Sequence, residues 1–260
     1  MAYATLMRYF PGLWLFGIAA KAVHALFTRR DIPIKRFWMR VPMRYYQIAL
    51  GFFLTIFILE GASMARDGVS TSKQSLENMF AHVQPHNLSS RREGLSVTLT
   101  YRGETDMKLI SKEKKELDAR IEPTVRVVSI FILIVFGLFM SRGKDWEVMG
   151  LGLIPYFMLT TSSYYYYVLR LTGVVVHAAD LSKRRNAIGL AILFFIEVVT
   201  NGIEQMVPGN RYLLISMMGI LLIIYGLLMI GWFGYDWWIA HKEAALALPV
   251  SGAKSKSKKK

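Results

Sequence analysis

One stretch of this sequence, Leu213–Phe233, carries no charged residue over 21 positions. A helix needs about 20 mostly apolar residues to cross the hydrocarbon core of a bilayer, and a run this uniformly apolar has no polar face to turn towards water. Apolar residues make up 53% of the 260 residues, and they gather into several such runs. The sequence therefore predicts an all-α integral membrane protein.

A second long run, Met149–Asp180, determines the topology of everything after it. As one helix it would extend about 48 Å, at about 1.5 Å per residue, against a hydrocarbon core of about 30 Å. We predict two crossings that join at Thr160–Tyr164, because small hydroxyl side chains can bond freed backbone groups and tyrosines suit the water–lipid boundary. This split also places Arg170 inside the membrane.

Seven crossings are predicted in all, with the amino end outside and the carboxyl end in the cytoplasm of a bacterial inner membrane. Their approximate ranges are Thr5–Phe27, Tyr46–Met64, Val125–Ser141, Val148–Leu159, Tyr164–Ala179, Ala187–Thr200 and Tyr212–Phe233. The orientation follows from three basic segments, Arg29–Arg44, Lys183–Arg185 and Lys254–Lys260, since cytoplasmic loops carry an excess of Lys and Arg. The net charge of +14 thus indicates contact with anionic lipid rather than with nucleic acid.

The crossings divide the chain into four parts. Residues 1–64 form two crossings with a basic cytoplasmic turn, 65–123 an extracytoplasmic loop, 124–240 a five-helix membrane bundle and 241–260 a disordered lysine-rich tail. The loop holds ten basic and nine acidic residues, so it lacks the positive bias of a cytoplasmic segment. We expect a mixed α/β cap, with a helix near Lys73–Val83, a strand at Leu95–Arg102 and a charged helix at Ser111–Ile121.

Several ionisable residues fall inside the apolar spans, where each costs about 2.5–3.5 kcal/mol on insertion scales and so needs a partner or a purpose. Arg170 and Glu197 lie in the outer third of neighbouring spans, which allows an ion pair between them. Two interpretations stay open: a structural interhelical pair, or a polar outer-leaflet pocket in which arginine holds a lipid phosphate. The candidate pocket residues are Arg126, Arg170, Glu197, Glu60, Tyr164 and Tyr165.

No catalytic, cofactor-binding or metal-binding set stands out in the sequence. The chain has no cysteine, which excludes thiolate nucleophiles and cysteine metal sites. His82 and His86 bracket Pro85, so they do not share a helical face. The glycine-rich, nucleophile-elbow and zinc-protease motifs are absent. We therefore expect no cofactor and no complete catalytic constellation in this chain.

Short motifs run through most of the chain. They are FPGLWLFGIAAKAV at Phe10–Val23, an RFW turn at Arg36–Trp38, an F…H…RxGL pattern at Phe80, His86 and Arg92–Leu95, and SSYYYY after a glycine-rich span. Together they resemble the carboxyl-terminal membrane half of bacterial multipass proteins related to GT-C glycosyltransferases, which use polyprenyl-phosphate sugars. The resemblance implies that Arg126 and Arg170 grip the donor phosphate. It also implies a truncated, split or repurposed relative, because the acidic catalytic residue of that family is expected in an amino-terminal half.

Three functional hypotheses follow. The leading one is a non-catalytic subunit or scaffold of a larger inner-membrane assembly, whose partners are membrane lipids and other membrane-protein subunits. The second is a component of a lipid-linked sugar transferase that lacks its catalytic half and binds a polyprenyl-phosphate lipid. The third is a transporter, which the absence of an inverted repeat and of a midplane carboxylate cluster in the sequence disfavours.

Overall fold

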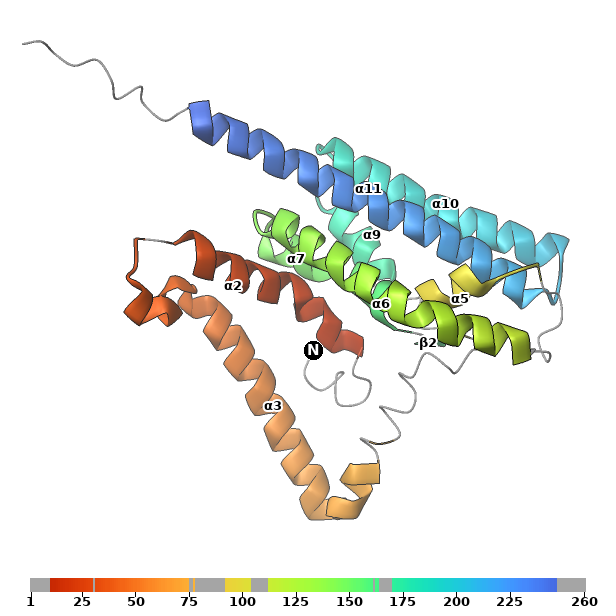
Figure 1. The fold of residues 1–260 in the computed structure, drawn as a ribbon, viewed down its shortest axis with the longest axis horizontal. Coiled ribbons are helices and arrows are strands. Elements are labelled where there is room, and N and C mark those ends of the chain that lie inside the picture. Colours follow the sequence, from red (N-terminus) through yellow and green to blue (C-terminus); the bar gives the residue numbers. More distant parts are fainter. Residues whose placement is uncertain are drawn as a thin grey trace, which may run out of the picture.

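The structure is a computed structural model, and it describes residues 10–29, 31–74, 77, 92–103, 112–160, 162–163 and 170–246. Helices dominate these residues (Figure 1). In chain order the elements are η1 (Phe10–Leu15), α2 (Phe16–Thr28), η2 (Ile34–Arg40), α3 (Met43–Asp67), β1 (Arg92–Glu93), α5 (Leu95–Thr100), α6 (Lys112–Met140), α7 (Asp145–Gly150), α8 (Leu153–Leu159), β2 (Ser162–Ser163), α9 (Arg170–Ala178), α10 (Arg184–Met206) and α11 (Arg211–Leu246).

Four helices are long and apolar enough to cross a membrane. The qualifying stretches are Met43–Asp67, Glu116–Met140, Arg184–Met206 and Tyr212–Glu243. They coincide with the second, third, sixth and seventh predicted crossings, so the prediction of a helical membrane protein is confirmed at this level. Shorter helices occupy the described parts of the other three, and the count of seven crossings stays a prediction.

The predicted break in Met149–Asp180 is confirmed. Helix α8 ends at Leu159, and Thr160 is extended, with φ −127° and ψ 154°. The Thr160 hydroxyl donates a hydrogen bond over 2.7 Å to the Tyr156 carbonyl, which also accepts the Thr160 backbone N–H at 3.1 Å, so this hydroxyl is satisfied within its own turn. The chain then forms β2, which pairs antiparallel with β1.

A second break, which the sequence did not reveal, separates α7 from α8 at Leu151–Gly152. Gly152 packs directly against Trp14, and a Cβ atom built at this position would lie 2.7 Å from the Trp14 backbone. Both Leu151 and Leu153 are 1% exposed, so this break lies in the core of the bundle. Non-helical backbone at membrane depth is tolerated when protein surrounds it in this way.

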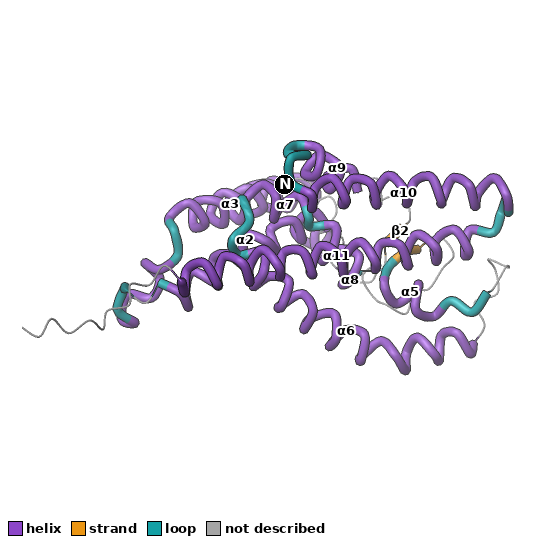
Figure 2. Tube along the Cα trace, turned by 90° about the horizontal axis from the view of Figure 1, so that it is seen from above, coloured by secondary structure: helices purple, strands orange, loops and turns teal. Residues whose placement is uncertain are grey.

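The predicted strand at Leu95–Arg102 is wrong, because Leu95–Thr100 forms the short helix α5. This helix is part of the bundle, where it contacts α6, α8 and α11, and it does not form a cap outside it (Figure 2). Thr98 and Thr100 are buried, and their hydroxyls donate to the carbonyls of Gly94 and Ser96, 3.1 and 3.0 Å away. The alternation of apolar and polar residues over Leu95–Arg102 predicted a strand with its threonines facing water. On the helix these threonine hydroxyls bond to backbone carbonyls of the same turn, which lets them enter the core.

Two helices run past the boundaries predicted from sequence. The charged helix at Ser111–Ile121 and the crossing at Val125–Ser141 are one helix, α6, with Pro123 inside it. The carboxyl-terminal tail does not begin at 241, since α11 continues to Leu246. At this end Trp237 stacks on His241 with ring centroids 5.1 Å apart, and Lys242 lies over Trp238, so side-chain contacts extend the helix. The lysine-rich residues 247–260 lie outside the described residues.

The bundle core forms where α2, α6, α8, α10 and α11 meet, and α3 diverges from it (Figures 1 and 2). Its most deeply buried side chains include Phe136, Tyr156, Ile196 and Met229, all 0% exposed. Helix α5 is held against α11 by a close contact between Thr98 and Gly219. A Cβ atom at Gly219 would lie only 1.9 Å from the Thr98 hydroxyl oxygen. Small residues allow such close approach between helices in a bilayer, where no hydrophobic force drives them together.

We predict that Gly219→Val lowers the free energy of unfolding by about 1–3 kcal/mol, because the added side chain must displace Thr98 and α5. The matched control is Gly231→Val on the same helix, where a Cβ atom would meet nothing within 4 Å. Thermal unfolding of the purified protein measures both. Equal unfolding midpoints for the two variants would contradict the close packing of α5 on α11.

Candidate functional site

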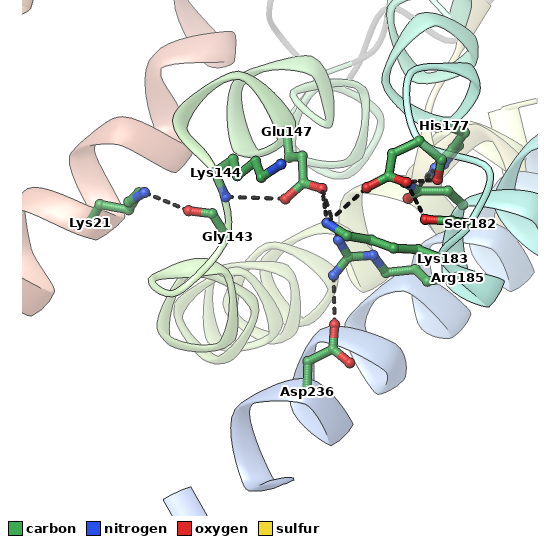
Figure 3. A network of polar contacts seen from close by, with 11 residues as sticks. Lys21, Gly143, Lys144, Glu147, His177, Ser182, Lys183, Arg185 and Asp236 are labelled. Carbon is green, nitrogen blue, oxygen red and sulfur yellow. Dashed lines mark hydrogen bonds and ion pairs between the residues drawn. The ribbon is translucent and has the colours of Figure 1, made fainter. Parts of the chain in front are cut away.

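A buried carboxylate, Glu147, is the centre of a polar network at one end of the bundle (Figure 3). Its side chain is 2% exposed. One carboxylate oxygen, Oε1, accepts hydrogen bonds from Lys183 Nζ at 2.9 Å and from Arg185 at 3.1 Å. The other oxygen accepts the backbone N–H of Lys144 at 3.1 Å, which caps the first turn of α7. Three donors from two segments thus converge on one buried anion.

Arg185 extends the network from α10 to α11. Its side chain is 7% exposed, and its second terminal nitrogen donates to Asp236 Oδ2 at 2.7 Å. The guanidinium carbon lies 4.1 Å from the centre of the Phe233 ring, which adds a cation–π contact. The guanidinium is therefore held between two carboxylates and an aromatic face, and it joins α7, α10 and α11.

A second group of charges at the same end surrounds Asp145. Lys21 from α2 donates to Asp145 Oδ1 at 2.5 Å and to the Gly143 carbonyl at 2.5 Å. The Tyr45 hydroxyl from α3 donates to the same Asp145 oxygen at 3.2 Å, and Arg44 lies 3.5 Å from the other oxygen. The α6–α7 turn therefore links α2 and α3 to the rest of the bundle. Three segments predicted to face the same side of the membrane meet here.

Burial alone would raise the pKa of the Glu147 carboxyl, but its hydrogen bonds and the neighbouring positive charges outweigh this effect. The hydrogen bonds from Lys183 and the Lys144 backbone, with the charge of Arg185, lower its pKa below the ordinary value of 4.5. Burial likewise works to raise the pKa of Asp145, and contacts with Lys21, Arg44 and Tyr45 lower it overall. Both groups are thus carboxylates at neutral pH, although they sit in a partly apolar environment.

Sequence reasoning missed this network. Residues 142–147 were only the link between two predicted crossings, Val125–Ser141 and Val148–Leu159, and the basic segments were interpreted as contacts for lipid. The available signal was the pair of acidic residues, Asp145 and Glu147, inside a turn between two apolar runs. Acidic residues in a turn that is expected beside two strongly basic segments predict ion pairs among these segments.

A buried histidine lies close to the network. His177 on α9 is 1% exposed, its Nε2 atom is 2.8 Å from the Tyr225 hydroxyl, and its Nδ1 atom is 3.3 Å from Asn186 Oδ1. Gly189 on α10 makes room for the ring, since a Cβ atom there would lie 2.5 Å from His177 Nε2. The ring is therefore fixed by two hydrogen bonds and by close packing. Figure 3 shows it beside the polar network.

The predicted pair between Arg170 and Glu197 forms. Arg170 on α9 approaches Glu197 Oε1 on α10 at 2.6 Å, with 13% of the arginine side chain and 47% of the glutamate side chain exposed. A second guanidinium nitrogen of Arg170 contacts the sulfur of Met218 on α11. The pair thus ties three helices together and leaves the glutamate half exposed. Whether a lipid phosphate binds there stays a prediction.

Two of the remaining candidates for the outer pocket, Arg126 and Glu60, lie on other helices. Arg126 forms an ion pair with Glu122 one turn earlier on α6, and 58% of its side chain is exposed. Glu60 lies near the end of α3, the helix that diverges from the bundle (Figure 1). Tyr164 and Tyr165 lie outside the described residues. Among the four pocket candidates that the structure describes, the contact that it shows is the one between Arg170 and Glu197.

The described residues also offer no evident metal centre, since they contain no group of three or more His, Asp or Glu side chains placed to hold an ion. Comparisons of this chain with protein-family models, with curated proteins and with solved structures find no match.

We predict that Glu147→Gln lowers the free energy of unfolding by about 3–5 kcal/mol at neutral pH, because Arg185 and Lys183 lose the buried charge that they share. The matched control is Glu77→Gln, whose partner Lys73 is 3.9 Å away and where both side chains are mostly exposed. This change should cost less than about 1 kcal/mol. Thermal unfolding measures both, and equal losses would contradict the central role of Glu147.

The lowered pKa of Glu147 also predicts a pH dependence. A carboxyl whose pKa is lower in the folded state stabilises the fold above its unfolded value, and this contribution disappears as pH falls through the folded pKa. The wild-type unfolding midpoint should therefore drop steeply below about pH 4.5. The same titration of Glu147→Gln should show a shallower drop over this range, and parallel curves would contradict the assignment.

Proposed function

We propose that this protein is a non-catalytic membrane subunit of a larger membrane assembly, and that α3 is the helix that contacts its partner. One observation carries the proposal. None of the most apolar 18-residue stretch of α3 is buried, whereas 28%, 28% and 44% of the corresponding stretches in the other three candidate spans are buried. A span that packs so little on its own chain is available to another chain.

The surface of α3 suits contact with a second helix. Large apolar side chains lie on it, and Phe53 and Phe57 are 66% and 77% exposed. Gly51 and Gly61 face open space, since a Cβ atom at either position would meet nothing within 4 Å. Glycines let two helices approach closely in a bilayer, and the nearby carboxylate of Glu60 favours a partner with a hydrogen-bond donor or a basic group. We therefore expect a partner helix along the exposed apolar surface of α3.

In this proposal the chain crosses a bacterial inner membrane seven times, with its amino end outside and its carboxyl end in the cytoplasm. The grouping of Arg44, Lys183 and Arg185 at one end of the bundle supports it, because basic residues concentrate on the cytoplasmic side. An alkaline phosphatase reporter fused after Arg185 should be inactive, since it would remain in the cytoplasm. An active reporter at this position would reverse the orientation.

Site-directed crosslinking tests the role of α3, and the chain is suited to it because it has no cysteine of its own. Gly51→Cys and Gly61→Cys, placed in the native membrane, should each form a crosslinked product with a partner. Gly231→Cys on α11 is the matched control, since it also faces open space but lies on a helix packed in the bundle. The mass of the product distinguishes a different subunit from a second copy. Crosslinking no stronger than the control would reject the proposal.

A second candidate function is a component of a lipid-linked sugar transferase, and the Arg170–Glu197 pair favours it. A guanidinium beside a half-exposed carboxylate can exchange one carboxylate contact for a phosphate. In this alternative Arg170 holds the phosphate of a polyprenyl-phosphate lipid, and the catalytic acid comes from another chain.

Arg170→Ala separates the two candidates. For a structural pair, we expect a loss of about 1 kcal/mol in stability, since Glu197 stays half hydrated, together with lower abundance of the assembly. For a phosphate site, we expect normal membrane insertion and abundance but loss of glycolipid product. Quantitative immunoblotting of the membrane fraction and analysis of extracted glycolipids measure the two outcomes, and Lys73→Ala is the control for loss of an exposed ion pair.

A further inference from the structure

An almost entirely apolar pocket opens between α5, α6, α8 and α11. Its cavity volume is about 90 Å³, and hydrocarbon or thioether side chains form nearly all of its lining. The exception is Tyr225, whose hydroxyl already lies 2.8 Å from His177 Nε2 and therefore presents its ring to the pocket. This volume is several times the roughly 10–15 Å³ that one water molecule needs, so the pocket has room for a segment of a hydrocarbon chain.

The pocket lies at membrane depth. Ile132 on α6 and Leu222 and Leu227 on α11 belong to its wall, and they fall well inside the candidate spans Glu116–Met140 and Tyr212–Glu243. Water that entered would find no polar partner in such a lining, and apolar cavities of this kind stay dry. A peptide is also excluded, because its backbone groups would lose their hydrogen bonds there.

The pocket runs from the lipid-facing surface to the centre of the bundle. Leu227 at its mouth is 55% exposed and is continuous with the exposed apolar surface of α11, where Ile224 is 45% exposed. Leu153 and Ile154 of α8 form its inner wall and are only 1% and 4% exposed. The hydrocarbon that surrounds the candidate spans can therefore extend into the pocket without crossing a polar layer.

We propose that this pocket binds one acyl chain of a bilayer phospholipid as an integral part of the fold. The lining supplies dispersion contacts along a hydrocarbon tail and no group that would distinguish one headgroup from another. Occupancy therefore depends on the chain and is independent of headgroup charge. The bound tail covers Leu153 and Ile154 of α8, which are 1% and 4% exposed and which ordinary surface lipid cannot reach. This inference goes beyond the proposed function, which concerns the outer face of α3.

A glycine in the pocket wall provides the variant that tests this proposal. A Cβ atom at Gly226 would meet only the Ile154 Cγ2 atom, 3.9 Å away, so Gly226→Leu places a side chain in the pocket without a backbone clash. Gly231→Leu is the matched control on the same helix, in open space. Both variants replace a glycine by a residue with a higher helix propensity, so they differ in the pocket alone.

The experiment uses the full chain in nanodiscs that contain phosphatidylcholine with a photoreactive diazirine in its acyl chain, and mass spectrometry locates the labelled residues. We expect labelling of the buried α8 residues Leu153 and Ile154 in the wild type and in Gly231→Leu, and loss of this labelling in Gly226→Leu. Labelling restricted to exposed residues of α3, α6 and α11, or α8 labelling that Gly226→Leu leaves unchanged, would overturn the proposal.

Two further measurements on the wild type test the occupant without depending on the variant. Unlabelled phosphatidylcholine and phosphatidylglycerol with the same chains should compete equally for α8 labelling. Competition by phosphatidylglycerol alone would mean that a headgroup site, and not the apolar pocket, holds the lipid. Labelling of Leu153 or Ile154 by a water-soluble diazirine would mean that the pocket is hydrated, and it would also overturn the proposal.

Discussion

The buried contact between Glu147 and Arg185 is the interaction on which the helical bundle depends. A carboxylate that is 2% exposed needs compensation for its lost hydration, and three donors from Lys144, Lys183 and Arg185 provide it. Because the same guanidinium also binds Asp236, the position of α7 determines how α10 and α11 sit beside it. A buried ion pair of this kind adds little net stability over an apolar contact, but it specifies which helices are neighbours.

The short helices inside the bundle depend on that arrangement. Helices α5, α7 and α8 contain six, six and seven residues, and none is long enough to be stable by itself. Close contacts hold them: Gly152 against Trp14, and Thr98 against Gly219. The ends of these helices expose backbone groups at membrane depth, and the surrounding long helices shield these groups from lipid. The apolar pocket lies where α5 and α8 leave the wall between α6 and α11 incomplete.

The molecule thus has three regions with different roles. The Glu147 and Asp145 networks organise one end, and the Arg170–Glu197 pair ties three helices farther from that network. Helix α3 is joined to the bundle through α2 and the Tyr45–Asp145 hydrogen bond, while its apolar length stays unburied. Rigid attachment at one end and an open face along the rest is a suitable arrangement for a helix that binds another membrane chain. The candidate phosphate site and the candidate partner surface therefore use different helices.

The amino-acid sequence alone determined the long apolar helices and the break at Thr160, and it placed Arg170 and Glu197 where an ion pair between them is possible. These follow from hydropathy, chain length and the cost of a charge in lipid, which are properties of a local segment or of two segments at the same depth. Only the tertiary structure decided that Leu95–Thr100 is a helix inside the bundle, that Glu147 is buried, and that α3 stands apart. The reason is that burial depends on neighbours far along the chain: Thr98 is accommodated by Gly219, and Glu147 is joined to Asp236 through Arg185.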